Sequence, residues 1–474
     1  MADFRRILIR ATNWIGDAIM SLPALGAVRA RFPQAHIAVL ARPWVADLYE
    51  GEAAVDEVLL YRNTSVRERL RIAHALRKRH FEAAILLQNA FDAALLAWLA
   101  GIPQRIGYNR DGRGLLLTRD VPVPQAGEIP RHERFYYLEM LRRAGLIESF
   151  PPDAPIRLDG ADRLRRRGRD LYAGRGIPMP VVAVSPGAAY GTAKRWLPER
   201  FAAAATQLAA KIGASVVCFG SGSERALCAA VSQAIDQQGV RSFNLAGETE
   251  LRDYIALAAA ASLYLTNDSG AMHIASALAV PTVTVFGATD HTTTGPTGHA
   301  ARIIREPVEC SPCLLRECPI DHRCMTAVTV ERVVSAGIEL LHREGEGQRD
   351  MDTRRKIVDV DEALRVAAEE SVCVVSGYFD PLTAEHAGRL EEIRREASDG
   401  RVVVAIQDLP GSLLDSRSRA EMVAALRTVD YVVAGEGVER VLANVPGDRL
   451  IREEDADGER QRRLVEHIRA RHEA

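Results

Sequence analysis

The sequence predicts an α/β protein, in which parallel sheets carry helices on their faces. Strand-like apolar runs alternate with helical patterns along most of the 474 residues, and this alternation is typical of parallel strands joined by right-handed crossovers. A chain of this length exceeds the usual size of one domain, so we expect two or three. Hydrophobic residues make up 47% of the chain, which is enough for real cores and argues against extensive disorder.

The first α/β series is expected to form one domain over residues 1–160. Its predicted strands, which are rich in apolar and β-branched residues, are 6–10, 36–40, 58–61 and 83–87. The predicted helices include residues 18–31 and the basic stretch 67–80. Prolines within 150–156 mark the approach to a domain boundary.

A second series is expected to form a domain over residues 161–345. Its first two strands are predicted at 181–185 and 215–219, and the alternation continues to about residue 305. A short, polar, glycine-containing stretch at 343–350 predicts a second break in the chain.

A smaller third domain is expected over residues 355–474, and its first strand is predicted at 371–375. Residues 351–474 carry a formal net charge of −7, whereas residues 1–350 carry +5. The mildly basic larger part suits anionic ligands or an anionic bilayer surface.

The stretch from Leu263 to Gly287 predicts a strand, a polar loop, a helix and a second strand. In open α/β sheets, ligands bind outside the carboxyl ends of the strands, and a helix N-terminus there favours an anion. Asp268, Ser269 and Gly270 occupy this position, and His273 follows on the helix. Two interpretations stay open: Asp268 or Ser269 caps the helix, or the loop contacts a ligand.

A second polar loop follows the first predicted strand and contains Gly16 and Asp17. Gly16 permits a close approach, and Asp17 falls at the start of the next helix. Taken alone, Asp17 is more often a helix cap or a partner of the helix dipole than a catalytic base. The loop is not a dinucleotide-binding fingerprint, because Gly-x-Gly-x-x-Gly is absent after the strand.

Two further strand ends carry residues that suit a nucleoside diphosphate. After the strand at 181–185, small residues let main-chain N–H groups approach an anion, and two cations neutralise its charge. After the strand at 215–219, a carboxylate is placed to accept hydrogen bonds from ribose hydroxyls. The residues are Ser185, Gly187, Thr192, Lys194, Arg195 and Glu224. The alternatives are a solvated Lys-Arg pair and a glutamate that only favours the first turn of a helix.

Together these motifs resemble the family 9 glycosyltransferases, the bacterial ADP-heptose:lipopolysaccharide heptosyltransferases, and most of all their heptosyltransferase II group. The matching segments are 13–17, 100–108, 185–188 with 193–198, 267–273, and 310–313 with 317–319. The resemblance covers about residues 5–340, with the motifs in the family's order. It implies a GT-B fold, with an acceptor domain, a donor domain and an active site in the cleft between these two Rossmann-like domains.

The resemblance also implies roles for single residues. Asp17 corresponds to the proposed general base of a single displacement with inversion. Lys194 matches a diphosphate contact, Glu224 a ribose contact, and Asp268–Gly270 with His273 the loop around the sugar and phosphates. Ser185, Gly187, Thr192 and Arg195 complete the expected donor site. The donor would be ADP-L-glycero-β-D-manno-heptose, and no cofactor or metal is required for the reaction.

The implied acceptor is the inner core of lipopolysaccharide, built on lipid A. Its phosphates favour arginine contacts, so Arg110 and Arg113 on a glycine-rich loop are expected to bind it, together with Asn13. No run approaches the ~20 apolar residues of a spanning helix, and the N-terminus lacks the apolar core of a signal peptide. We expect a cytoplasmic protein in peripheral contact with the inner membrane, without a nucleic-acid partner.

Four cysteines lie within fifteen residues, at Cys310, Cys313, Cys318 and Cys324, and His322 stands among them. One C-x-x-C followed by two more cysteines could enclose structural zinc, but the second close pair of a zinc ribbon is missing, so a metal is not the favoured interpretation. Disulfides are not expected in a reducing cytoplasm. The family tolerates similar cysteines without using a metal in catalysis.

Residues 370–474 resemble the cytidylyltransferase-like nucleotidyltransferases, which include the adenylyltransferase that makes ADP-heptose. Thr383 and His386 keep two positions of the superfamily's signature, and Arg419 begins a second similar segment. Glu385 replaces the signature's glycine, and further acidic residues stand where a triphosphate should bind. We therefore expect a degenerate, inactive domain that docks or stabilises.

Three functions follow from these residues. The leading one is heptose transfer from ADP-heptose to lipopolysaccharide. The others are an active nucleotidyltransferase in residues 370–474, alone or beside the transferase, and a non-catalytic protein that binds sugar nucleotides. Product analysis distinguishes all three.

Overall fold

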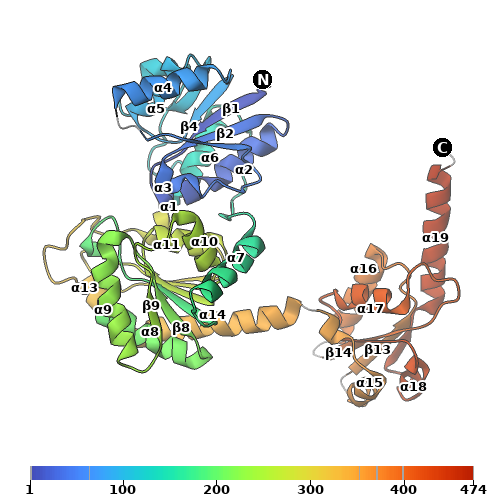
Figure 1. The fold of residues 1–474 in the computed structure, drawn as a ribbon. Coiled ribbons are helices and arrows are strands. Elements are labelled where there is room, and N and C mark those ends of the chain that lie inside the picture. Colours follow the sequence, from blue (N-terminus) through green and yellow to red (C-terminus); the bar gives the residue numbers. More distant parts are fainter. Residues whose placement is uncertain (1–2, 63–64, 352, 370–371, 398–399, 473–474) are drawn as a thin grey trace. The chain divides into compact units, whose positions relative to one another are not determined.

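The computed structural model describes residues 3–62, 65–351, 353–369, 372–397 and 400–472. The chain forms two compact units, residues 1–344 and residues 345–474, which we call unit 1 and unit 2 and describe separately (Figure 1). Ser371, the first residue of the strand predicted at 371–375, lies outside the described residues.

Unit 1 begins with a sheet of six parallel strands in the order β3-β2-β1-β4-β5-β6. The strands are β1 (Arg6–Arg10), β2 (His36–Ala41), β3 (Glu57–Leu60), β4 (Ala83–Leu86), β5 (Gln104–Tyr108) and β6 (Arg119–Val121). The central strands are buried on both faces, which explains their continuous apolar sequences. The four predicted strands are confirmed to within a residue or two; β5 and β6 contain polar residues and a glycine and were not predicted.

Helices pack on both faces of this sheet. They are α1 (Ile15–Met20), α2 (Leu22–Arg31), α3 (Pro43–Ala46), α4 (Val66–Arg77), α5 (Phe91–Leu99) and α6 (Glu133–Arg143), with a 3₁₀ turn at Gly114–Leu116. The single helix predicted over 18–31 is wrong, because the chain turns at Ser21 and α2 starts at Leu22, with Pro23 in its first turn. Proline is tolerated there because the first turn of a helix needs no donor from it.

The second sheet of unit 1 repeats the first, in the order β12-β11-β10-β7-β8-β9. Its strands are β7 (Val181–Ser185), β8 (Ser215–Cys218), β9 (Ser242–Asn244), β10 (Leu263–Asn267), β11 (Thr282–Val285) and β12 (Ala301–Ile304). The helices are α7 (Ala161–Gly174), α8 (Pro198–Ile212), α9 (Arg225–Asp236), α10 (Leu251–Ala259), α11 (Gly270–Ala277), α12 (His291–Thr294), α13 (Arg323–Thr326) and α14 (Val330–Met351), with 3₁₀ turns at Thr192–Lys194 and Gly222–Glu224. The strand, loop, helix and strand predicted within 263–287 are confirmed as β10, α11 and β11.

In both sheets the strand order reverses beside the first strand, β1 or β7. The carboxyl ends of the strands beside such a reversal form a crevice in which α/β proteins bind ligands. Asp17 follows β1, Ser185 ends β7, and Asp268 follows β10. One buried apolar cluster contains residues of both sheets, including Ile9 and Val181, so the two halves of unit 1 share a core.

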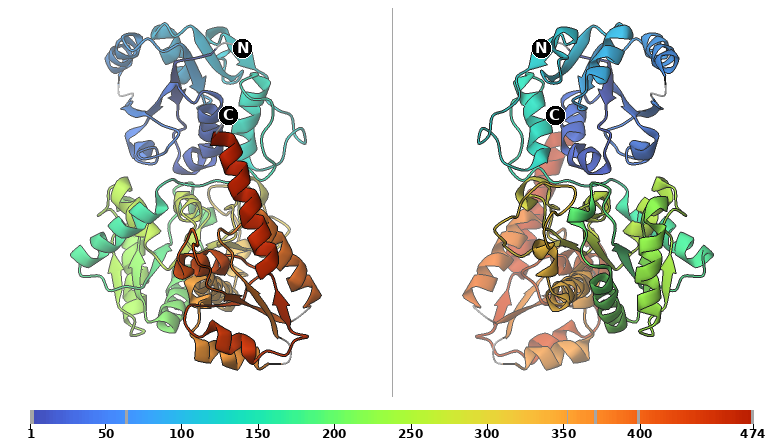
Figure 2. Two further views of the ribbon diagram at one scale, coloured as in Figure 1. Left: turned by 90° about the vertical axis from the view of Figure 1, so that its right-hand side faces the viewer. Right: turned by 90° about the vertical axis from the view of Figure 1, so that its left-hand side faces the viewer.

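Unit 2 has a four-stranded parallel sheet in the order β15-β14-β13-β16. Its elements are a 3₁₀ turn at Thr353–Lys356, α15 (Val360–Ala367), β13 (Val372–Gly377), α16 (Ala384–Glu396), β14 (Arg401–Ile406), α17 (Ser416–Ala424), β15 (Tyr431–Ala434), α18 (Val438–Ala443), β16 (Leu450–Arg452) and α19 (Glu454–His472). The helix α19 extends beyond the sheet of its own unit (Figures 1 and 2).

The polar stretch 343–350, predicted as a break, is helical in its backbone because α14 continues through it. The division between the two units nevertheless falls there. Among the helices of the described ranges, none is long and apolar enough to cross a membrane.

Candidate functional site

The two halves of unit 1 meet where α1 faces α11. A Cβ atom on Gly16 would lie 3.0 Å from Cδ2 of His273, and one on Gly270 would lie 3.0 Å from Cβ of Ile15. Such distances are tighter than ordinary contacts, so a side chain at either glycine would have to push its neighbour aside. The polar loops after β1 and β10, which the sequence predicted separately, therefore lie against each other.

Asp17 stands in the first turn of α1 and is half-buried. Burial raises the pKa of its carboxyl above the ordinary value, and the nearby charge of Lys194 lowers it in part. The residue before the helix, Trp14, makes no side-chain capping bond, and Asp17 lies inside the helix rather than at its cap. Its negative charge still interacts favourably with the dipole of α1 at the helix N-terminus. The structure places it beside the cation of the other half.

Asp268 does not cap α11. The N-cap position belongs to Ser269, whose side chain makes no capping bond. Instead, the buried Asp268 carboxylate accepts hydrogen bonds at Oδ2 from Lys194 Nζ at 2.6 Å and from Thr289 Oγ1 at 2.5 Å. Lys194 is thus mostly enclosed and paired, so the alternative of a solvated Lys-Arg pair is wrong for it. Thr289 was missed because it follows β11 in no recognisable motif.

His273 is buried against this pair. Burial lowers its pKa to about 4; the carboxylate of Asp268 opposes this shift, while His132 and Lys194 add to it. The imidazole is therefore neutral near pH 7. His132 also lies here, with Nε2 donating to Gly295 O at 2.9 Å and Nδ1 accepting from Arg134 N at 3.2 Å. Sequence reasoning missed His132, which lies in no recognised motif.

A cavity of about 600 Å³ opens beside α11, which contributes Gly270, Ala271 and Ile274 to its wall. Among the predicted donor residues it is lined by Ser185, Gly187, Glu224, Ser269 and Gly270, and Trp44 and Tyr254 also line it. Its size fits within the range of small-molecule sites, and its wall combines aromatic and small residues with a few polar groups.

Gly187 and Glu224 approach each other closely in this cavity. A Cβ atom on Gly187 would lie 1.9 Å from Oε1 of Glu224, so the glycine makes room for the carboxylate. The other oxygen, Oε2, accepts from both Ser221 N and Ser221 Oγ at 2.8 Å. Glu224 therefore stabilises the turn that starts α9, as the alternative predicted, and still presents one oxygen to the cavity.

Polar side chains hold the loop after β7 in place. Ser185 Oγ lies 2.7 Å from Tyr264 Oη. Asn267 donates through Nδ2 to Pro186 O at 2.8 Å and accepts at Oδ1 from Trp196 N at 2.8 Å. These bonds fix the loop that carries Lys194.

The two other predicted donor contacts are Thr192 and Arg195. Thr192 is exposed. Arg195 donates to Ala188 O at 3.4 Å, and its buried Nε finds no partner among the described residues.

The three predicted acceptor residues differ in placement. Arg110 is exposed and lies beside Tyr136 and Glu133. Asn13 is held by Arg10, whose Nη2 donates to its Oδ1 at 2.8 Å.

Arg113 is fully buried, and this overturns the prediction that it faces a ligand. It donates through Nε to Tyr108 O at 2.9 Å and through Nη2 to Asn89 Oδ1 at 2.9 Å, and it also bonds Gln88 O. Its guanidinium therefore stabilises the loop through these hydrogen bonds to the protein interior.

A second cavity of about 230 Å³ is lined by Arg131, His132, Glu133 and Tyr136, among others. Burial, together with the charge of Asp17, raises the pKa of Glu133 above its ordinary value. This cavity therefore lies close to the Asp17 carboxylate.

The four clustered cysteines are free thiols and, with His322, line a cavity of only about 70 Å³. Within the described part of the chain, no group of three or more histidine, cysteine, aspartate or glutamate side chains is placed to hold a metal ion. This arrangement gives no support to the structural zinc that the spacing left open.

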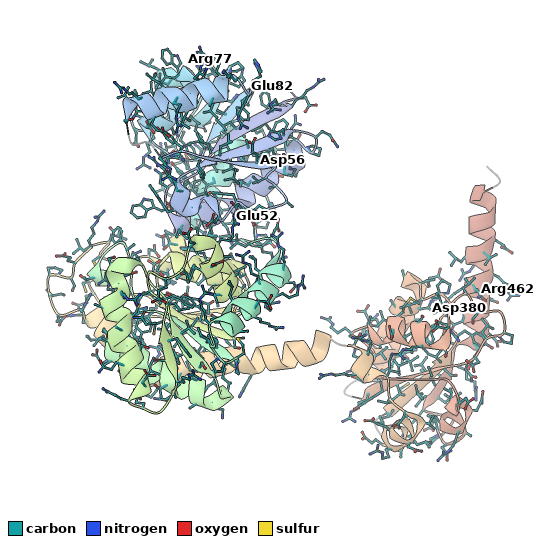
Figure 3. The ribbon with its side chains drawn as sticks, in the orientation of Figure 1. Glu52, Asp56, Arg77, Glu82, Asp380 and Arg462 are labelled. Carbon is teal, nitrogen blue, oxygen red and sulfur yellow. The ribbon has the colours of Figure 1, made fainter. Side chains whose placement is uncertain are left out.

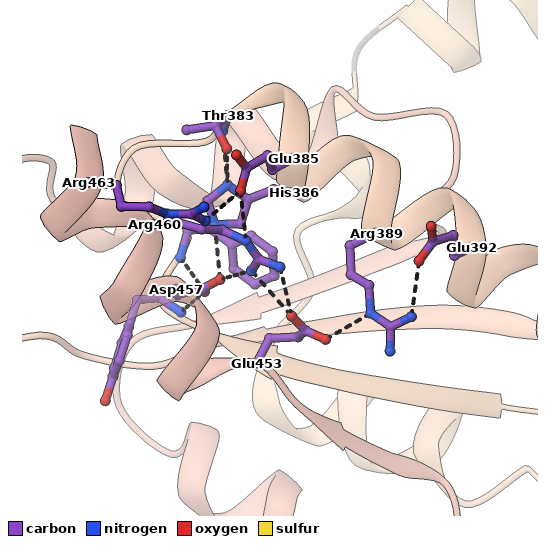
Figure 4. Close-up of polar contacts among 11 residues, drawn as sticks. Thr383, Glu385, His386, Arg389, Glu392, Glu453, Asp457, Arg460 and Arg463 are labelled. Carbon is purple, nitrogen blue, oxygen red and sulfur yellow. Dashed lines mark hydrogen bonds and ion pairs between the residues drawn. The ribbon is translucent and has the colours of Figure 1, made fainter. Parts of the chain in front are cut away.

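In unit 2 the signature residues bond to their own domain (Figure 4). His386 is buried and lies between Thr383 and Asp457. Arg419 is buried and donates to Tyr378 O and Gln407 O, both at 2.9 Å.

Comparisons with known proteins match unit 1 to one family. The profile of glycosyltransferase family 9 (heptosyltransferase) matches residues 69–323. Lipopolysaccharide heptosyltransferase 2 of Escherichia coli (strain K12) is 34% identical over 310 residues, which cover 63% of this chain and 88% of that protein. Lipooligosaccharide heptosyltransferase 2 of Campylobacter jejuni serotype O:2 is 25% identical, with 71% and 98% covered.

Solved structures agree as well. The structure of E. coli ADP-heptose LPS heptosyltransferase II matches with a TM-score of 0.61 and 29% identity, covering 72% of this chain and 99% of that one. A family 9 glycosyltransferase from Veillonella parvula DSM 2008 matches in fold, with a TM-score of 0.62 at 20% identity. The GT-B fold predicted for the larger part of the chain is therefore confirmed. The nucleotidyltransferase-type domain stays a prediction, since the family profile ends at residue 323.

Proposed function

The chain belongs to glycosyltransferase family 9 (heptosyltransferase), and from this premise we propose that it transfers heptose from ADP-L-glycero-D-manno-heptose to the inner core of lipopolysaccharide. The observation that carries the proposal is the meeting of Asp17 with Lys194, Asp268 and His273 between the two halves of unit 1. One half supplies a carboxylate that can take a proton, and the other supplies groups that suit a sugar nucleotide.

We assign the donor to the 600 Å³ cavity and the loops beside it. Glu224 Oε1 would accept from the ribose, and the main-chain N–H groups at the start of α11 would face the diphosphate. Lys194 already lies 2.6 Å from Asp268, so it is positioned before the donor arrives. The hydrogen bonds that Lys194 and Thr289 donate to Asp268 both end on Oδ2. The other oxygen, Oδ1, would accept a hydrogen bond from a sugar hydroxyl.

We propose that Asp17 is the general base. An acceptor hydroxyl has a high pKa, so a carboxylate within reach must take its proton as the new bond forms. Burial raises the pKa of Asp17, which makes it a stronger base than an exposed aspartate. Attack from this side would displace ADP in one step, with inversion at the anomeric carbon.

Negative charge then develops on the departing ADP. Lys194, Arg195 and the N-terminus of α11 would stabilise that charge, in place of a metal ion. The neutral His273 would donate or accept a hydrogen bond without adding charge next to Lys194.

The acceptor would enter by the cavity lined by Arg131 and Glu133, with the exposed Arg110 near Glu133, and Asn13, in the loop before α1, would add a further contact. Phosphate groups on the acceptor would pair with the arginines. An acceptor anchored in a bilayer would bring the protein to the cytoplasmic face of the inner membrane. A nucleotidyltransferase activity is not favoured, because Thr383 and His386 bond to other residues of unit 2.

Asp17→Asn tests the role of the base. We expect the variant to fold normally and to lose transfer by several orders of magnitude in kcat, since the amide cannot take a proton. Asp111→Asn, a change at an exposed aspartate on the Arg110 loop, serves as the control and should keep kcat. Near-normal turnover by Asp17→Asn would remove Asp17 from the mechanism.

A further inference from the structure

In unit 2, the carboxylate of Asp457 is buried among converging donors. The side chain of Asp457, on α19, is 2% exposed. Its Oδ2 accepts from the main-chain N–H groups of Tyr378 at 2.7 Å and Phe379 at 3.0 Å, in the turn after β13. Its Oδ1 accepts from His386 Nε2 at 2.9 Å and Arg460 Nη1 at 2.7 Å. Figure 4 shows this convergence of α16, α19 and the turn on a single group.

The protons of this cluster can be assigned from its bonds. His386 Nδ1 accepts from Thr383 N at 3.0 Å, so the ring carries its hydrogen on Nε2 and donates it to Asp457. Burial alone would raise the pKa of Asp457, but the bonds from His386, Phe379 and Tyr378 outweigh it and lower that pKa. Asp457 is therefore an ionised group in a fixed set of donors.

No space remains for another anion beside it. A Cβ atom on Gly377 would lie 2.6 Å from Asp457 Oδ2. The neighbouring hollow, lined by His386, Arg389 and Arg460, has no volume that would admit a water molecule.

The surrounding cations are also matched by acids of the same unit. Glu453 accepts from Arg389 at 3.0 Å and from Arg460 at 3.2 Å. Glu385, which the sequence placed in a glycine position, lies 2.9 Å from Arg463 and 3.7 Å from Arg460. A free anion would have to displace these carboxylates as well.

We propose that the Tyr378–Phe379 turn, together with His386 and Arg460, is a binding site for a phosphoryl anion that the chain fills with its own Asp457. Paired main-chain N–H groups in a turn and a guanidinium are the donors that phosphate prefers in proteins. A carboxylate on the same chain competes at a high effective concentration, so unit 2 takes no nucleoside phosphate there. The cluster instead holds α16 and α19 onto β13.

Hydrogen exchange of the full chain, read by mass spectrometry on peptides spanning residues 374–386, tests this directly. Asp457→Ala removes the internal anion and should speed exchange of the Tyr378 and Phe379 amides at least about tenfold. Inorganic pyrophosphate should then slow it again, relative to sodium chloride at equal ionic strength. The matched control is Asp455→Ala, which removes an exposed carboxylate from the same helix and should leave this peptide unchanged.

The wild-type chain provides a second, independent arm. Pyrophosphate should leave exchange of residues 374–386 unchanged in the wild type, because the site is filled; slowed exchange would overturn the proposal. Labelling of Cys373, the single cysteine of unit 2, reports whether Asp457→Ala keeps the unit folded. A folded variant whose fast exchange does not respond to pyrophosphate would overturn it too, and if the variant unfolds, the wild-type arm decides.

Discussion

Glu52 stands at the junction between the two halves of unit 1 (Figure 3). Its buried Oε1 accepts from Asp159 N at 2.9 Å, and Asp159 Oδ2 accepts in return from Ala53 N at 2.9 Å. Burial raises the pKa of Glu52 from 4.5 to about 7; the charge of Asp159 adds to the rise, and the bond from the Asp159 amide opposes it. We predict that this residue makes unit 1 less stable in alkaline solution.

The sign follows from the two states of the chain. The folded pKa of Glu52 lies above the unfolded one, so its protonated form stabilises the fold below about pH 4.5, and this stability is lost as the pH rises through 7. A change from 4.5 to about 7 corresponds to about 3 kcal/mol. Glu52→Gln keeps an oxygen for the Asp159 amide and cannot ionise. It should therefore raise the free energy of unfolding by about 3 kcal/mol at pH 8.5 and by little at pH 5.

Urea unfolding followed by tryptophan fluorescence measures this effect in unit 1, because all four tryptophans precede residue 200. Glu148→Gln, a change at an exposed glutamate, is the control and should be neutral at both pH values. An equal effect of Glu52→Gln at pH 5 and pH 8.5 would refute the reasoning, since it would mean that ionisation of Glu52 does not differ between the folded and unfolded chain.

Three further predictions concern the site and its loops. Lys194→Met should move the acid limb of the kcat/KM pH profile to higher pH, because the lysine charge lowers the pKa of Asp17; an unmoved limb would contradict this coupling. Gly187→Ala should raise the donor KM about tenfold, because its Cβ displaces Glu224, whereas Gly174→Ala, which points into open space, should leave the KM unchanged. Arg113→Ala should lower the free energy of unfolding in urea by about 3 kcal/mol, because it leaves buried acceptors unpaired. Arg110→Ala should cost little stability and should instead raise the KM for the acceptor. The reverse pattern would mean that the two arginines have exchanged roles.

The strand ends were the reliable part of the sequence prediction. Apolar runs predicted where β1, β7 and β10 end, and parallel topology brings the polar residues after β7 and β10 to one edge of the second sheet. That is why Lys194 and Asp268 could be grouped without a structure, whereas Asp17, which follows a strand of the other sheet, was grouped with them through the family resemblance. The roles of all three in transfer stay predictions.

Other features depend on contacts that no local pattern encodes. A glycine-rich loop predicts that Arg113 is accessible, but the direction of its side chain depends on carbonyls of neighbouring segments such as Gln88. Thr289 and His132 join the site only because loops distant in sequence fold together. The cysteine spacing likewise resembled a metal site, but the side chains of the described residues are not arranged to hold one.

The central claim is that unit 1 joins a heptose to a lipopolysaccharide core through a single inverting displacement. The most direct measurement is to incubate the full chain with ADP-heptose and truncated core acceptors, and to record the mass and anomeric configuration of the product. We predict an acceptor heavier by one heptosyl residue, with the anomeric configuration inverted relative to the donor. An acceptor that stays unmodified, or a product with retained configuration, would contradict the account.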